Sequence, residues 1–211
     1  MDIYASDDEK GEEIKQWWRD NGRAVLVTIV LSCALIFSGR YWLNHQATVT
    51  EQASLSYQEL ALLLTEDKKA ETEQKVQQLF SEFSSTPYAV FSAFDMAKKS
   101  VELEDNDAAK TYFQWIIDHA ELSGHKALAQ LRLSELLLSE SKFDLAYELI
   151  NQPTSTSFTS LFAEAQGDIL VAQNKDKDAR AAYQTAMMSL GQGQPRQSIL
   201  QLKLDDVAIP Q

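Results

Sequence analysis

The sequence predicts an all-α protein: one membrane-spanning helix, then a stack of helix pairs with a further helix at its C-terminal end. Three observations predict this class. Residues 24–39 form a run that has no charged side chain. After it, apolar residues recur at spacings of three and four, as in helices with one buried face. Small and aromatic residues in that region also repeat at a nearly constant period.

Composition excludes several classes of protein. Of the 211 residues, 45% are apolar and only seven are Gly and four Pro, so the chain is expected to fold around a core. A single cysteine, Cys33, cannot form an internal disulfide, and three scattered histidines do not supply a zinc site. The net charge of −12 opposes binding to a phosphate backbone. The sequence therefore predicts no metal, no cofactor and no nucleic-acid partner.

The apolar run is long enough to cross a lipid bilayer. Residues 24–39 are uncharged, and residues 40–43 extend the segment. A helix of about 20 residues, rising about 1.5 Å per residue, spans the hydrocarbon layer of about 30 Å. Arg40 is tolerated because its long side chain reaches the headgroups. Aromatic residues typical of membrane interfaces flank the run: Trp17, Trp18, Tyr41 and Trp42.

Two other interpretations of this run are a buried core helix and a cleaved signal peptide. A core helix usually has a polar stripe, which the run lacks. A signal peptide has a short basic start and a small-residue cleavage site, whereas here residues 1–23 include seven acids and no such site follows the run. We therefore interpret the run as an uncleaved signal anchor.

Flanking charges predict the orientation. Four basic residues precede the run, and Arg40 alone follows it before Lys68. The positive-inside rule then places residues 1–23 in the cytoplasm as an acidic tail, residues 24–43 in the membrane and residues 44–211 on the far side. In a bacterium the far side of the inner membrane is the periplasm, and in a eukaryotic cell it is a lumen or the exterior.

Helix pairs fill the rest of the chain. Gly, Pro and capping residues separate the segments with helical periodicity. The predicted helices are 51–64, 71–83, 87–103, 107–120, 126–139, 143–151, 157–172, 177–190 and 196–207.

A degenerate repeat runs through these helices. The clearest unit has the small, large, small, aromatic and small residues of a tetratricopeptide repeat, in order Gly167, Leu170, Ala179, Tyr183 and Ala186. The earlier equivalents Val76, Ala109 and Ala146 precede Ala179 at nearly equal steps, close to the period of about 34 residues of that repeat. Small residues allow paired helices to approach closely, and the aromatic residue packs against the next pair. The fold class is therefore a tetratricopeptide-like α-solenoid, with 196–207 as its capping helix.

The motifs of catalytic and ligand sites are absent from the sequence. It has no Gly-x-Ser-x-Gly, no phosphate-binding Gly-rich loop and no His-Glu-x-x-His. The segment starting at Asn174 imitates the beginning of an EF-hand loop but has Ala179 and Thr185 where Gly and Glu are required. The sequence therefore predicts a protein that is not an enzyme.

A binding surface is predicted on the first helices of the pairs, which line the concave face of a tetratricopeptide stack. Its apolar lining, with an acidic rim, would suit an amphipathic peptide or the flank of another protein. The alternative is that the capping helix or a neighbouring repeat covers it. The candidate residues are Phe91, Phe94, Val101, Leu128, Leu131, Leu138 and Leu161.

Four segments carry a resemblance to a known family: MDIYASDDEKGEEIKQWWRDNGRA at the start, GRYWLNHQ after the apolar run, ASLSYQEL beyond it and QLKLDD near the end. They resemble the YfgM-type ancillary subunit of the bacterial SecYEG translocon, over essentially the whole chain. Ser100 and Pro153 depart from the repeat pattern, so local irregularity is expected there.

The resemblance implies an inner-membrane anchor with a periplasmic repeat domain. It implies association with SecYEG and with a membrane-anchored, parvulin-type periplasmic chaperone, and a role in passing translocated proteins to periplasmic chaperones. It implies no enzymatic activity. The alternative function is that of an assembly factor for another envelope complex.

Overall fold

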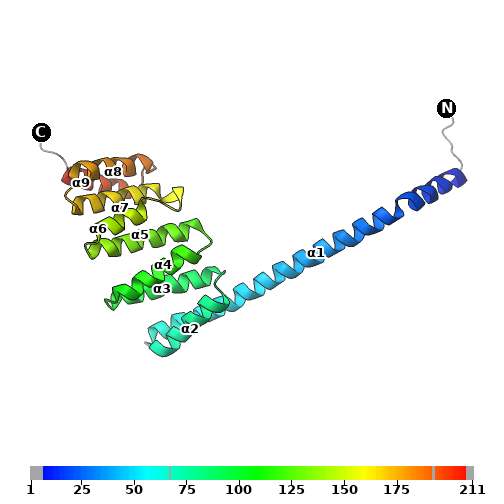
Figure 1. The fold of residues 1–211 in the computed structure, drawn as a ribbon, viewed down its shortest axis with the longest axis horizontal. Helices are drawn as coiled ribbons and strands as arrows, with labels where there is room; N and C mark the ends of the chain where they lie inside the picture. The colour runs from blue at the N-terminus through cyan, green and yellow to red at the C-terminus, as the bar shows by residue number, and fades with distance from the viewer. Residues whose placement is uncertain (1–6, 67, 192, 208–211) are drawn as a thin grey trace. The chain divides into compact units, whose positions relative to one another are not determined.

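The computed structural model describes residues 7–66, 68–191 and 193–207, with side chains from residue 11 onward. The first six residues of the predicted tail lie outside the described residues. Every regular element of the described part is a helix, which confirms the all-α class (Figure 1). The chain divides into two compact units, and the boundary lies between Glu51 and Gln52.

Helix α1 (Asp7–Thr65) contains the whole apolar run. No proline lies between its ends, so nothing interrupts the backbone hydrogen-bond ladder, and the helix predicted to begin at residue 51 is instead the last part of α1. Only 6% of the most apolar 18-residue stretch of α1 is buried within the protein, whereas the core helix of a soluble protein is mostly buried. By length and composition α1 is the one described helix that can cross a membrane. The predicted interface residues are exposed along it: Trp17, Trp18, Tyr41 and Trp42.

The second unit is a succession of helix pairs. The end of α1 is followed by α2 (Lys69–Glu82), and each later pair packs on the one before (Figure 1). The remaining elements are α3 (Pro87–Glu102), α4 (Asn106–His119), α5 (Ser123–Ser139), α6 (Phe143–Ile150), the 3-10 turn η1 (Thr156–Phe158), α7 (Thr159–Ala172), α8 (Asp176–Ser189) and α9 (Arg196–Asp206).

The turn within each pair has the same geometry in three successive repeats. Glu104, Ser141 and Asn174 all have a φ of 58–60°. In each case the next residue donates its backbone N–H to a carbonyl five residues earlier, at 2.9 Å. This is the arrangement that ends a helix with a left-handed residue. The repeat is therefore present in the backbone as well as in the side chains.

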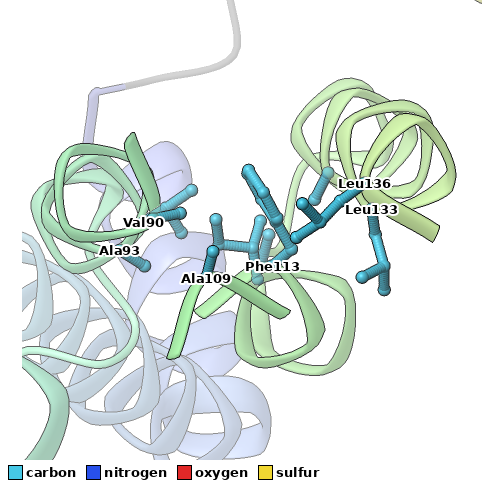
Figure 2. Packing of buried hydrophobic residues seen from close by; sticks show 10 residues of the cluster. Val90, Ala93, Ala109, Phe113, Leu133 and Leu136 are labelled. Atoms are coloured by element: carbon cyan, nitrogen blue, oxygen red, sulfur yellow. The ribbon is translucent and has the colours of Figure 1, made fainter. Parts of the chain in front are cut away.

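Apolar side chains pack between the helices where the period places them. Ala109 of α4 lies against Val90 and Ala93 of α3, and Phe113 fills the space toward α5 (Figure 2). Ala93 and Ala109 are fully buried, which lets α3 and α4 approach closely. Ile116 completes the cluster and is also fully buried.

Candidate functional site

The first helices of the pairs form the surface predicted to bind partners, called here the first-helix face. It consists of the outward side of α3, α5 and α7 together with the end of α1. Phe91, Leu128 and Leu161 occupy one register position on three successive helices, each about one repeat period after the last. The face divides into an aromatic part, a pocket and a charged part.

The aromatic part lies at the N-terminal end of the face. Tyr57 of α1, Tyr88 of α3 and Phe91 of α3 have ring centroids 5.9 to 6.1 Å apart. His125 of α5 lies 5.7 Å from the Phe91 ring, so the contacts join two successive repeats. Phe91 retains 37% of its exposure. Accessible aromatic rings held by one another are typical of protein-binding hot spots.

A hydrogen bond fixes the first ring of this part. The Tyr57 hydroxyl donates to Asp95 of α3 at 2.7 Å. Burial of the hydroxyl, the bond to this carboxylate and its charge raise the pKa of Tyr57 to about 12. The phenol is therefore neutral at physiological pH and remains a donor.

The pocket lies between α5 and α7. It is a cavity of about 150 Å³ whose apolar lining includes the half-buried residues Leu128, Leu138 and Leu161. Arg132 and Glu135 form an ion pair of 2.7 Å at its edge. The structure thus brings four of the predicted binding residues together in one pocket, these three and Leu131.

Leu131 requires a correction. It lines the same pocket but is only 6% exposed and belongs to the apolar cluster with Ala127 and Ile150. Leu131 packs within the helix pair against Ile150 of α6, whereas Leu128 is half-buried. Leu131 is therefore a core residue, and its substitution would test folding instead of binding. Phe94 is half-buried and packs edge-on against Phe113, while Val101 is 44% exposed at the end of α3.

The predicted acidic rim is not an open surface in the structure, because its carboxylates on α7 are paired with cations of α9. Glu164 of α7 is 3% exposed, because Arg196 and Lys203 of α9 bind its two carboxylate oxygens. Lys203 also binds Asp168 at 2.6 Å, and Asp168 accepts a hydrogen bond from the Tyr183 hydroxyl at 2.8 Å. The capping helix therefore covers the charged part of the face, as the alternative interpretation expected.

The charged groups of this part shift one another's pKa values. Burial alone would raise the pKa of Glu164, but the bonds from Arg196 and Lys203 outweigh it and lower that pKa. Burial would lower the pKa of Lys203, and its bonds to Asp168 and Glu164 raise it instead. Both groups are therefore ionised at neutral pH, and they hold α9 to α7.

The repeat-packing residues meet at the junction of α7, α8 and α9. Leu170, Ala179, Tyr183 and Ala186 belong to one buried cluster. A Cβ atom added to Gly167 would overlap the Tyr183 ring, so only glycine fits there without a shift. These residues hold the three helices together, and of them Leu170 also lines a cleft between α6 and α8.

Sequence reasoning missed Tyr57, Tyr88 and His125. Tyr57 precedes Phe91 by one repeat period of about 34 residues, so continuing the register backward would have found it. No comparable signal marks His125, because its contact with Phe91 depends on how α5 packs on α3. Among the described residues no group of three or more His, Cys, Asp or Glu side chains is placed to hold a metal ion.

Known proteins resemble this chain over nearly its whole length. The model of a family described as tetratricopeptide repeat-like domain matches residues 15–209. The chain belongs to this family. A relative in Haemophilus influenzae is 29% identical over 98% of this chain and 100% of its own length. A relative in Aggregatibacter actinomycetemcomitans is 26% identical over 92% of this chain and 94% of its own length. A relative in Escherichia coli is 22% identical over 90% of this chain and 91% of its own length.

All three relatives bear the name ancillary SecYEG translocon subunit, which confirms the resemblance seen in the sequence. Ancillary subunits built from such repeats are non-enzymatic scaffolds, and this chain is a protein of that kind. No solved structure matches the chain.

Proposed function

We propose that the protein is a membrane-tethered interaction scaffold associated with the SecYEG translocon. The observation that carries this proposal is the full-length similarity to ancillary translocon subunits, joined to a solenoid with an accessible first-helix face. A tether confines the solenoid near the channel and so raises its effective concentration there. Individual contacts then need not be strong.

The proposed location is the bacterial inner membrane, with residues 1–23 in the cytoplasm, residues 24–43 in the bilayer and residues 44–211 in the periplasm. The excess of basic residues before the apolar run supports this orientation. An alkaline phosphatase reporter fused after Gln211 is expected to be active, and a green fluorescent protein in its place dark. The reverse result would place the solenoid in the cytoplasm and contradict the proposal.

The scaffold is further proposed to pass translocated proteins to a membrane-anchored, parvulin-type periplasmic chaperone. The aromatic part and the pocket support this step, because they offer apolar side chains that remain exposed or half-buried in the second unit. Phe91 and Val101 are exposed apolar residues of α3 on this face. Leu128, Leu138 and Leu161 supply the apolar lining of the pocket between α5 and α7.

The test is affinity purification of the full-length protein from gently solubilised membranes, followed by mass spectrometry. The channel subunits and the chaperone are expected with the wild type. Phe91→Glu combined with Val101→Glu is expected to lose the chaperone, while Leu202→Glu, a 65% exposed residue of α9, retains it. Unchanged helicity by circular dichroism shows that each variant is folded. Recovery of another envelope complex in place of the channel would instead favour an assembly factor.

A further inference from the structure

Helix α6 is shorter than its counterparts. The second helices of the other pairs, α2, α4 and α8, each have 14 residues, whereas α6 has 8. At about 1.5 Å per residue the missing residues correspond to about 9 Å of helix. The row of second helices therefore has a gap after Ile150.

The gap is a built feature of the fold. Pro153 prevents the helix from continuing past this point. Gln130 of α5, which is 6% exposed, donates its amide to the carbonyls of Leu149 and Gln152 and accepts from the backbone and hydroxyl of Thr154. Four hydrogen bonds from one buried side chain thus hold the chain in a fixed path away from the helix axis.

A cleft of about 680 Å³ opens beside this gap, between α6 and α8 and over α7. Its apolar lining includes Leu170, which is buried, and the half-buried Tyr147 and Ala182. Leu145 of α6 is 55% exposed and Met188 of α8 is 79% exposed. Each stands within one turn of a lining residue, so apolar side chains flank the cleft on both helices.

The charges that line the cleft are mostly negative. Asp144 and Glu148 of α6 and Asp178 of α8 face one cation, Lys175, among the described lining residues. Gln173 donates a hydrogen bond to Asp144 at 3.0 Å and so fixes that carboxylate at the edge. An occupant must therefore combine apolar side chains for the floor with basic side chains for the rim.

We propose that this cleft docks a basic amphipathic helix of a partner protein, which lies between α6 and α8 and over Leu170 of α7. A helix is the element that fits, because the lining runs along α6 from Asp144 to its C-terminal end and along two turns of α8, and a helix can carry apolar residues on one face with basic residues beside them. Apolar residues on one face of the partner would cover Leu170, Leu145 and Met188, with Lys or Arg beside them. The cleft lies on the second helices and is distinct from the first-helix face, so this inference goes beyond the proposed function.

The probe is a fluorescein-labelled, 14-residue Leu/Lys peptide of helical period, titrated with the full-length protein in an uncharged detergent and followed by anisotropy. Binding is expected to weaken with salt, and the matching Leu/Glu peptide is expected not to bind. Neutralisation of the cleft by Asp144→Asn, Glu148→Gln and Asp178→Asn is expected to weaken binding about tenfold, the combined effect of three exposed ion pairs. The matched control removes the same charge elsewhere, by Glu73→Gln, Glu82→Gln and Glu104→Gln.

A second pair of variants tests the cleft by its volume, without changing any charge. Ala181→Trp fills the cleft, and Thr111→Trp places the same bulk at the equivalent position of α4. Loss of binding with Ala181→Trp and retention with Thr111→Trp supports the proposal. No binding by the wild type, equal binding of the Leu/Glu peptide, or equal losses in the cleft and control variants would overturn it.

Discussion

The two ends of the solenoid use the same repeat geometry with different chemistry. Between α3 and α5 the buried surface is apolar, with Phe94 at the register position that Glu164 occupies on α7. At the α7 end, Glu164 and Asp168 bind two cations of α9. The period thus fixes which positions face the next helix, while the residue type decides whether the surface stays open or is closed by ion pairs.

This difference bears on where partners bind. The aromatic part is stabilised by ring contacts that leave Phe91 accessible. The charged part is neutralised by α9, because its carboxylates are already paired with Arg196 and Lys203. The first-helix face is therefore expected to bind partners at its N-terminal half, and the two regions are expected to differ in how much each stabilises the fold.

The largest expected effect is in the apolar region. Ile116→Ala removes a fully buried side chain of α4 and leaves a cavity in the cluster around Phe113. The free energy of unfolding is expected to fall by about 2–5 kcal/mol. Urea unfolding of the detergent-solubilised protein, followed by circular dichroism, measures this. A loss below about 1 kcal/mol would show that the α3–α5 cluster is not the main core.

The next effect concerns the junction with α9. Gly167→Ala places a methyl group where the Tyr183 ring lies, so the ring must move. Overpacking of this kind costs about 1–3 kcal/mol. The double variant with Tyr183→Leu makes room for the methyl group. Its added cost relative to Tyr183→Leu alone should be near zero, and a full additional loss would contradict the steric explanation.

A third variant tests the ion pairs that distinguish the two regions. Glu164→Gln keeps the shape of the side chain but removes the charge that Arg196 and Lys203 bind. The free energy of unfolding at pH 7 is expected to fall by about 1–2 kcal/mol, with a smaller loss at high salt. The matched control is Glu135→Gln, whose partner Arg132 is exposed; an equal loss there would contradict a special role for the buried pair.

The pH dependence of the same pair has a definite sign. Because the pKa of Glu164 is lower in the folded protein than its ordinary value of 4.5, its contribution to stability is present above pH 4.5. It is lost as the pH falls through the folded pKa. The wild type should therefore lose more stability than Glu164→Gln on acidification below pH 4.5. Parallel curves for the two proteins would show that Glu164 is not the group that titrates.

Much of this architecture follows from the sequence. Strong local signals predict helix ends within a residue or two, such as Pro87 at the start of α3 and Asp105 at the cap of α4. The repeat series that includes Ala109, Ala146 and Ala179 identifies fully buried positions, because a small residue at a helix contact is imposed by the distance between helices. The predicted start of α5 is three residues late, since Gly124 lies inside its first turn.

The site is less predictable, for reasons of packing. Leu131 and Leu128 are equally apolar in the sequence, and only the orientation of α5 decides that the first is buried and the second lines a pocket. Glu164 has the appearance of a solvated residue until Arg196, 32 residues later, reaches it. Contacts between distant segments of this kind have no local pattern, so no spacing rule reveals them.

The smallest expected effect tests how the aromatic part is held. Tyr57→Phe removes the hydrogen bond to Asp95 but keeps the ring contacts, so the free energy of unfolding should fall by about 0.5–1.5 kcal/mol. Burial of the hydroxyl, together with its bond to Asp95 and the charge of that carboxylate, raises the pKa of Tyr57 from 10.0 to about 12 on folding, so the stability contributed by the neutral hydroxyl is present below pH 10 and is lost as the pH rises toward 12. Tyr57→Phe should therefore lose less stability than the wild type between pH 10 and pH 12. Tyr88→Phe, a neighbouring ring of the same cluster, is the control, and an identical pH profile in both variants would show that the Tyr57 hydroxyl does not hold α1 to α3.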